Sequence, residues 1–381
     1  MSQVLANLWS GLGTLAAFLF VLSIVVFIHE YGHFKVARWC GVKVQAFSIG
    51  FGREVYGFQD KYGTRWRLNW LPLGGYVKFM DDENSASMPL KDALDRMTPE
   101  ERAGSFHAKP LWQKAAVIAA GPIANFILAI GLLAGIFMTV GVPVTPPRID
   151  DVVAGGAAEK AGLRGGDLVV AINGVAIESF SDIQRVVSIS SDVQLKVDVE
   201  RNGIRRSVDV TPERKEVPDG FGGQMRIGML GIKRNATAVD WTYKKYGPID
   251  ATILGVKECY FFVERNLSYL KDVIIGREKA DQLGGPIRIA DVAGKVATAG
   301  IVPLLHLTAM ISVSIGLFNL FPIPPLDGGH LLFYGAEAIR RRPLSEEVQG
   351  IGFRIGLALI LTLAVYAMWN DLGIVKRWLG G

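Results

Sequence analysis

Four stretches of the chain are apolar over the length that a helix needs to cross a bilayer. They lie near residues 12–36, 115–141, 301–321 and 351–369, and each is close to the ~20 apolar residues that a spanning helix requires. The number of crossings is therefore even. The pattern predicts a polytopic α-helical membrane protein with about four transmembrane helices.

The hydrophobic period changes between the first two stretches. Residues 47–55 and 65–79 alternate polar and apolar positions, with Gly50 and Gly52 in the first segment and two further glycines in the second, which indicates β-hairpins. Non-helical backbone near a membrane persists only where it packs against protein or lines a wet cavity. The hairpin region therefore offers an edge strand to an extended peptide, or it is a plain ribbon; the sequence leaves these alternatives even.

A long polar segment separates the second and third stretches. Its alternation predicts strands at residues 169–172 and 195–199, a short helix at 157–161 and a turn at 200–203. The motif A-x-x-A-G-L-x-x-G-D, followed by an I-N-G strand end, resembles a PDZ domain of the bacterial periplasmic type at residues 149–212. That resemblance implies capture of an extended C-terminus by strand addition. A spacer or a steric block is the alternative role.

The remaining segment is a connector at residues 213–300. Its residues 246–273 are predicted to form a long amphipathic helix, either a tether on the outer membrane interface or a segment that packs against another helix. The domain prediction is therefore a first half of a membrane core (1–148), an inserted α+β PDZ domain (149–212), this periplasmic connector and a second half of the core (301–381).

Composition and charge fit this organisation. Half of the residues are hydrophobic, and the two cysteines are too few for a disulfide framework or a cysteine metal cluster. Residues 1–11 contain no Lys or Arg, whereas residues 35–78 are rich in both, so the positive-inside rule places residues 40–113 in the cytoplasm and the PDZ segment outside. The net charge of +5 lies mostly in loops and does not indicate a nucleic-acid partner.

His29, Glu30 and His33 form an H-E-x-x-H pattern at the end of the first apolar stretch. Residues four apart share a helix face, so both imidazoles can hold one metal ion while Glu30 reaches a water on it. Ionisable side chains at membrane depth are costly and are functional by default. The alternatives are a soluble zincin-like helix or a chance match on a buried helix.

A catalytic zinc site usually needs a third protein ligand. The third apolar stretch ends in N-L-F-P-I-P-P-L-D-G-G-H, where prolines break the helix and offer Asp327 and His330. Sites with two histidines and a carboxylate and sites with three histidines both exist, so residue type leaves the two candidates nearly even.

The ordered motifs of nearly the whole chain resemble the site-2 protease family, nearest to the members that regulate the sigma-E stress response. They are H-E-x-x-H, G-F-G at 50–52, L-P-L-G-G-Y-V-K-F at 71–79, A-G-P-I-A-N-F at 120–126, the PDZ segment, and N-x-x-P-I-P-x-L-D-G at 319–328. The resemblance implies an intramembrane zinc metalloendopeptidase. By position it assigns zinc to His29, His33 and Asp327, acid/base catalysis to Glu30, and substrate binding or transition-state stabilisation to Asn319, Gly50 and Gly52.

The same resemblance implies the setting. The protein would lie in a bacterial inner membrane, in contact with lipid, and would cut single-span proteins such as an anti-sigma factor trimmed first by a periplasmic site-1 protease, or remnant signal peptides. One departure is the single recognisable PDZ module, where well-known members have two. Two other classes are open: a zinc transporter, which should show inverted repeats, and a PDZ-based scaffold, which would not need Glu30.

Overall fold

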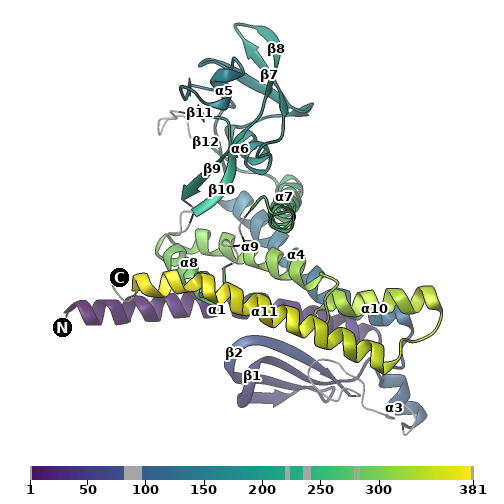
Figure 1. The fold of residues 1–381 in the computed structure, drawn as a ribbon. Helices are drawn as coiled ribbons and strands as arrows, with labels where there is room; N and C mark the ends of the chain where they lie inside the picture. Colours follow the sequence, from purple (N-terminus) through teal and green to yellow (C-terminus); the bar gives the residue numbers. More distant parts are fainter. Residues whose placement is uncertain are drawn as a thin grey trace. The chain divides into compact units, whose positions relative to one another are not determined.

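The computed structural model describes residues 2–80, 97–218, 224–234, 242–278, 280 and 284–378. The chain divides into two compact units. Unit 1 comprises Met1–Leu133 and Leu283–Gly381, and unit 2 comprises Ala134–Gln282. Unit 1 is built mainly of long helices, whereas unit 2 carries most of the short strands (Figure 1).

Four helices among the described residues are long and apolar enough to cross a membrane, as predicted. They are α1 (Ser2–Trp39), α4 (Leu111–Thr139), α9 (Ile301–Asn319) and α11 (Glu346–Trp378). The apolar side chains of α11 are mostly exposed; Ile355 and Val365, for example, are 66% and 67% accessible. Such an apolar exterior is stable in lipid rather than in water, so the protein is a membrane protein.

A short helix, α8 (Pro286–Thr298), packs against α1, α9 and α11 within unit 1. Its first turn is capped by the buried carboxylate of Asp371, which accepts hydrogen bonds from the backbone N–H groups of Gly285 (3.0 Å), Ile287 (3.1 Å) and Arg288 (3.2 Å). Asp371 lies on α11, so this cap ties α8 to the end of the last helix.

The predicted hairpin region of unit 1 consists of two long strands. β1 (Val44–Gln59) pairs with β2 (Arg65–Phe79), and both bend, so that Phe47 lies opposite both Val77 and Trp66. Phe47 and Val77 are buried in an aromatic cluster with Phe34 of α1 and with Phe79. The strands are thus attached to the helix that carries H-E-x-x-H. The short helix α3 (Pro99–Gly104) precedes α4.

Unit 2 has a four-stranded sheet in the order β6-β5-β7-β8. Its elements are β5 (Leu168–Ile172), β6 (Val175–Ala176), β7 (Leu195–Arg201) and β8 (Ile204–Val210), with helices α5 (Ala157–Lys160) and α6 (Phe180–Ile189). The strands at 169–172 and 195–199 and the helix at 157–161 are confirmed. The predicted turn is also present: Asn202 and Gly203 have φ of 52° and 80°, as a tight hairpin requires.

Paired short strands complete unit 2. They are β3 (Val142–Val144) with β12 (Thr242–Lys244), β4 (Asp151–Val152) with β11 (Ile232–Lys233), and β9 (Glu213–Pro218) with β10 (Gln224–Met229). The predicted amphipathic helix is present as α7 (Pro248–Ile274). It buries Ala251 and Cys259 and is joined to α6 by a 2.6 Å ion pair between Glu258 and Arg185.

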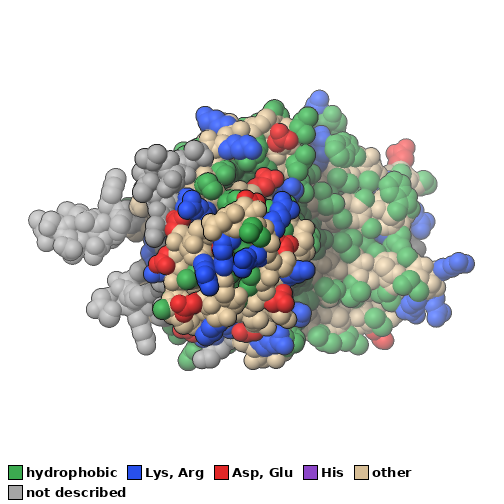
Figure 2. Space-filling view, turned by 90° about the horizontal axis from the view of Figure 1, so that it is seen from above, with side chains coloured by type: hydrophobic (Ala, Val, Ile, Leu, Met, Phe, Trp, Pro, Cys, Tyr) green, Lys and Arg blue, Asp and Glu red, His purple; other side chains and the backbone are tan. Residues whose placement is uncertain are grey.

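An ion pair of unit 2 includes a fully buried carboxylate. Arg201 contacts Asp167 at 2.6 Å, and the Asp167 side chain is fully buried. Burial alone would raise the pKa of Asp167, but hydrogen bonds from Arg201 and from the Arg164 backbone, with the charge of Arg201, outweigh it and hold the pKa below its ordinary value. On the face of unit 2 nearest the viewer in Figure 2, Lys and Arg alternate with Asp and Glu, as on a water-facing surface.

Candidate metal centre

Helix α1 brings two imidazoles together. His29 and His33 are one turn apart and both buried, and their Nε2 atoms lie 3.2 Å from each other. Their rings meet edge to face, with centroids 4.8 Å apart. The spacing that the sequence predicted therefore produces one convergent pair of nitrogen ligands.

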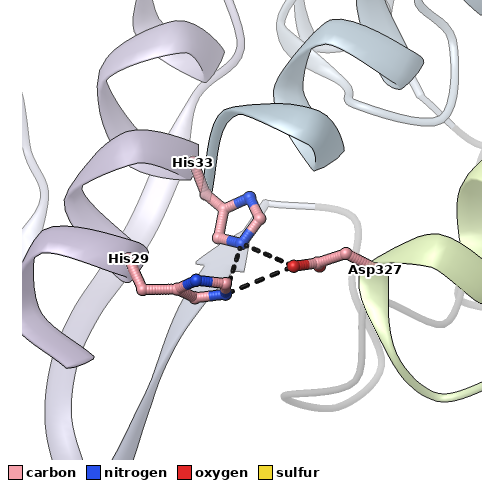
Figure 3. Close-up of side chains that lie close together, drawn as sticks. All are labelled: His29, His33 and Asp327. Carbon is pink, nitrogen blue, oxygen red and sulfur yellow. Dashed lines mark hydrogen bonds and ion pairs between the residues drawn. The ribbon is translucent and has the colours of Figure 1, made fainter. Parts of the chain in front are cut away.

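The third group comes from the turn after α9. Asp327 is the first residue of α10 (Asp327–Arg340), and its Oδ2 lies 3.2 Å from His29 Nε2 and 3.5 Å from His33 Nε2. Figure 3 shows the carboxylate pointing at the two imidazoles from a separate helix. Two glycines follow Asp327, and a Cβ at either position would collide with the backbone of the preceding turn. The tight reversal of the chain here therefore requires glycine.

These three side chains fit a zinc ion. Tetrahedral zinc with bonds of about 2.0–2.1 Å holds its ligand atoms about 3.3 Å apart. The three measured separations, 3.2, 3.2 and 3.5 Å, match that value. In addition, Oδ2 of Asp327 is buried and has no hydrogen-bond partner among the described residues, as expected of an oxygen that ligates a cation.

The metal group opens into a small cavity of about 200 Å³. Glu30 lines it beside the two histidines but is not one of the three convergent ligands. Gly75 of β2 lies against Glu30: a Cβ added at Gly75 would come within 2.8 Å of the Glu30 Cγ. The rest of the lining comes from β2, α4, the end of α9, the turn that follows it and α10: Tyr76, Val77, Phe79, Ile118, Asn319, Pro325 and His330.

Residues of helix α4 contact the Nδ1 atom of both histidines. Nδ1 of His33 donates to the carbonyl oxygen of Val117 at 2.9 Å, and Nδ1 of His29 lies 3.1 Å from the carboxamide of Asn125. Gly121 provides the space for His33, since a Cβ at that position would overlap the imidazole. Asn125 belongs to the A-G-P-I-A-N-F motif at 120–126 and Val117 precedes it, but neither residue has a role predicted from the sequence, because pattern does not reveal which helices meet.

The other predicted site residues are placed as follows. Asn319 lines the cavity, and its Nδ2 donates to the carbonyl of Ile315 at 3.0 Å. His330 also lines the cavity, but its ring packs on Phe353 with centroids 5.4 Å apart, outside the convergent group. Gly50 and Gly52 lie at the bend of β1 with φ of 84° and 89° and are not among the cavity-lining residues.

The chain is similar to known proteins over nearly its whole length. Residues 17–363 match Peptidase family M50. A protein of Rhizobium meliloti is 45% identical over 381 residues, covering all of both chains, and one of Agrobacterium fabrum is 45% identical over 372 residues, covering 98% of this chain and 99% of its own. Both are named as zinc metalloproteases. The metalloprotease MmpA of Caulobacter vibrioides is 40% identical, covering 96% of this chain and 98% of its own.

Proposed function

The chain belongs to peptidase family M50, the site-2 protease family, and is a zinc metalloprotease of the membrane; on this premise we propose that it cleaves single-span membrane proteins inside the bilayer. The observation that carries the proposal is the depth of the metal group. His29 and His33 lie within Gly11–Trp39, the first candidate span, and this position supports cleavage of a peptide bond inside the membrane.

We assign the zinc to His29, His33 and Asp327. When bound, the metal supplies an activated water and polarises the scissile carbonyl. Glu30 lies beside the ligands without being one of them, so it can take the proton of the attacking water and deliver it to the leaving amine. Asn319 uses one amide proton on Ile315, and the second would serve the substrate backbone or the developing oxyanion.

The substrate must be unwound before it can be cut, and β2 provides a template. Gly75, Tyr76 and Val77 line the cavity, and in the described part of the chain β1 is the only strand that pairs with this segment. An unwound substrate would add as a further strand along the free edge of residues 75–77. Gly50 and Gly52, at the bend of β1, would shape the approach to this edge.

Unit 2 would control access. We assign its four-stranded sheet with α5 and α6 to a PDZ module and place it in the periplasm of a bacterial inner-membrane protein, with the active site toward the cytoplasm; the basic residues between 35 and 78 support this orientation. In that position the module excludes proteins with bulky periplasmic domains. The substrate class is then a membrane protein already trimmed by a site-1 protease, such as an anti-sigma factor, or a remnant signal peptide.

The test uses the full chain purified in detergent. Zinc content is measured by atomic absorption, and cleavage of a model transmembrane peptide is followed with and without a chelator. About one zinc per chain and cleavage that stops on chelation and returns with added zinc are expected. Full zinc occupancy without cleavage of any single-span peptide would contradict the proposal and favour a transport or scaffold role.

A further inference from the structure

Both histidines of the metal group have a second nitrogen that faces α4, away from Asp327 (Figure 3). For His33 the partner is a backbone carbonyl, the oxygen of Val117. A carbonyl can only accept, so Nδ1 of His33 must carry the proton and Nε2 must present its lone pair to the metal position. The tautomer of this ligand is therefore fixed by the backbone of α4.

His29 needs the same tautomer, but its partner is a side chain that can donate or accept. The carboxamide of Asn125 is fully buried, and its nitrogen Nδ2 is placed 3.1 Å from Nδ1 of His29. In this orientation the nitrogen would donate to Nδ1 and leave the histidine proton on Nε2, where it would block ligation. If its oxygen faces the ring, it accepts the Nδ1 proton and frees the Nε2 lone pair.

Nothing else in the described part of the chain holds the carboxamide in the blocking orientation. Oδ1 of Asn125 has no hydrogen-bond partner there, so the amide can rotate by half a turn without losing a bond at that atom. The backbone of Asn125, in contrast, is fixed by a hydrogen bond: the hydroxyl of Ser312 on α9 donates to the main-chain carbonyl of Asn125 at 2.8 Å. The residue is thus fixed in place while its amide remains adjustable.

We propose that Asn125 is a positioning residue of the metal centre, whose Oδ1 accepts the Nδ1 proton of His29 and thereby keeps Nε2 available as a zinc ligand. The inference rests on the ligand set given under the proposed function. It gives α4 the same task at both ligands, performed by the main chain for His33 and by a side chain for His29. Partners of this kind typically change metal affinity 10- to 100-fold when they are removed.

The experiment measures the zinc dissociation constant of the full chain in detergent by competition with a fluorescent chelator. Asn125→Leu has a similar size but no acceptor and should weaken zinc binding about 10- to 100-fold. Asn125→Asp retains an acceptor at the same place and should bind zinc within about threefold of wild type, or more tightly. Ser312→Ala, the matched control, removes the neighbouring buried contact of α4 without touching His29 and should also stay within about threefold.

Two outcomes would overturn the inference. One is Asn125→Leu, or Asn125→Ala if the leucine variant fails to fold, binding zinc as tightly as wild type. The other is Asn125→Asp binding as weakly as Asn125→Leu, which would mean that the position must donate. His29→Ala separates the two levels of argument: if it also retains zinc, the ligand set itself is wrong, and if it loses zinc while the Asn125 variants do not, only the role of Asn125 is wrong.

Discussion

Gly121 offers a quantitative test of how α4 shapes the site. A Cβ added at this position would overlap the imidazole of His33, and the nearest atom is the ligand nitrogen Nε2 itself. Gly121→Ala can therefore be accommodated only if His33 moves, which also strains its bond to Val117. Inserting a methyl group into a packed interior costs about 1–3 kcal/mol. At ~1.4 kcal/mol per factor of ten, that strain corresponds to zinc binding weakened about 5- to 150-fold.

The same helix supplies the control. Gly131 also lies in α4, but nothing lies within 4 Å of a Cβ built there. Alanine improves helix propensity over glycine by about 1 kcal/mol at either position, so comparing Gly121→Ala with Gly131→Ala removes that contribution. The difference between the two variants is then the steric effect on His33.

The assay is zinc affinity by chelator competition, with thermal unfolding of the metal-free protein measured alongside. Gly131→Ala should bind zinc as wild type does and unfold at the same or a slightly higher temperature. Gly121→Ala should bind zinc more weakly by the factor given above. Equal affinities in the two variants would refute the placement of Gly121 against the metal ligand.

Three further predictions concern the third ligand, the ion pair of unit 2 and access. Asp327→Ala should strip most of the zinc whereas His330→Ala should not, as metal analysis will show; the reverse result would exchange their roles. Asp167→Asn should destabilise unit 2 by about 1–3 kcal/mol at pH 7 in denaturant unfolding followed by circular dichroism, because it leaves Arg201 without its carboxylate partner. Since the folded-state pKa of Asp167 is depressed, the wild-type advantage is complete above the unfolded pKa and should vanish as the pH falls through the folded value; a gap that persists in acid would exclude this cause. Deleting residues 149–212 should allow cleavage of untrimmed substrate while cleavage of trimmed substrate continues; loss of cleavage of the trimmed form alone, in a folded and zinc-loaded variant, would favour capture of a new C-terminus.

The features that were predictable from the sequence are those with local causes. Apolar runs of span length identify the four long helices, and the spacing of His29 and His33 identifies a shared helix face, because both depend only on neighbours along the chain. Period-two alternation likewise located β5 and β7, and Asn202-Gly203 marked the turn after β7.

The features that were missed depend on contacts between distant residues. The partners of His33 and His29 on α4 are 84 and 96 positions away in the chain, and the cap that Asp371 provides to α8 spans up to 86 positions. Gly75, rather than Gly50 or Gly52, lines the cavity because β1 and β2 bend and change register, which alternation alone does not encode. Such contacts are set by packing rather than by local pattern.

The central claim is that a glutamate beside the metal ligands performs the proton transfers of peptide hydrolysis. Glu30→Gln keeps the size of the side chain and leaves His29, His33 and Asp327 untouched, so the variant should retain about one zinc per chain while cleavage of a transmembrane peptide falls by at least about 100-fold. Zinc content and initial cleavage rate, measured on the same detergent-purified sample, decide the matter. A Glu30→Gln protein with full zinc and a cleavage rate near that of wild type would contradict the account.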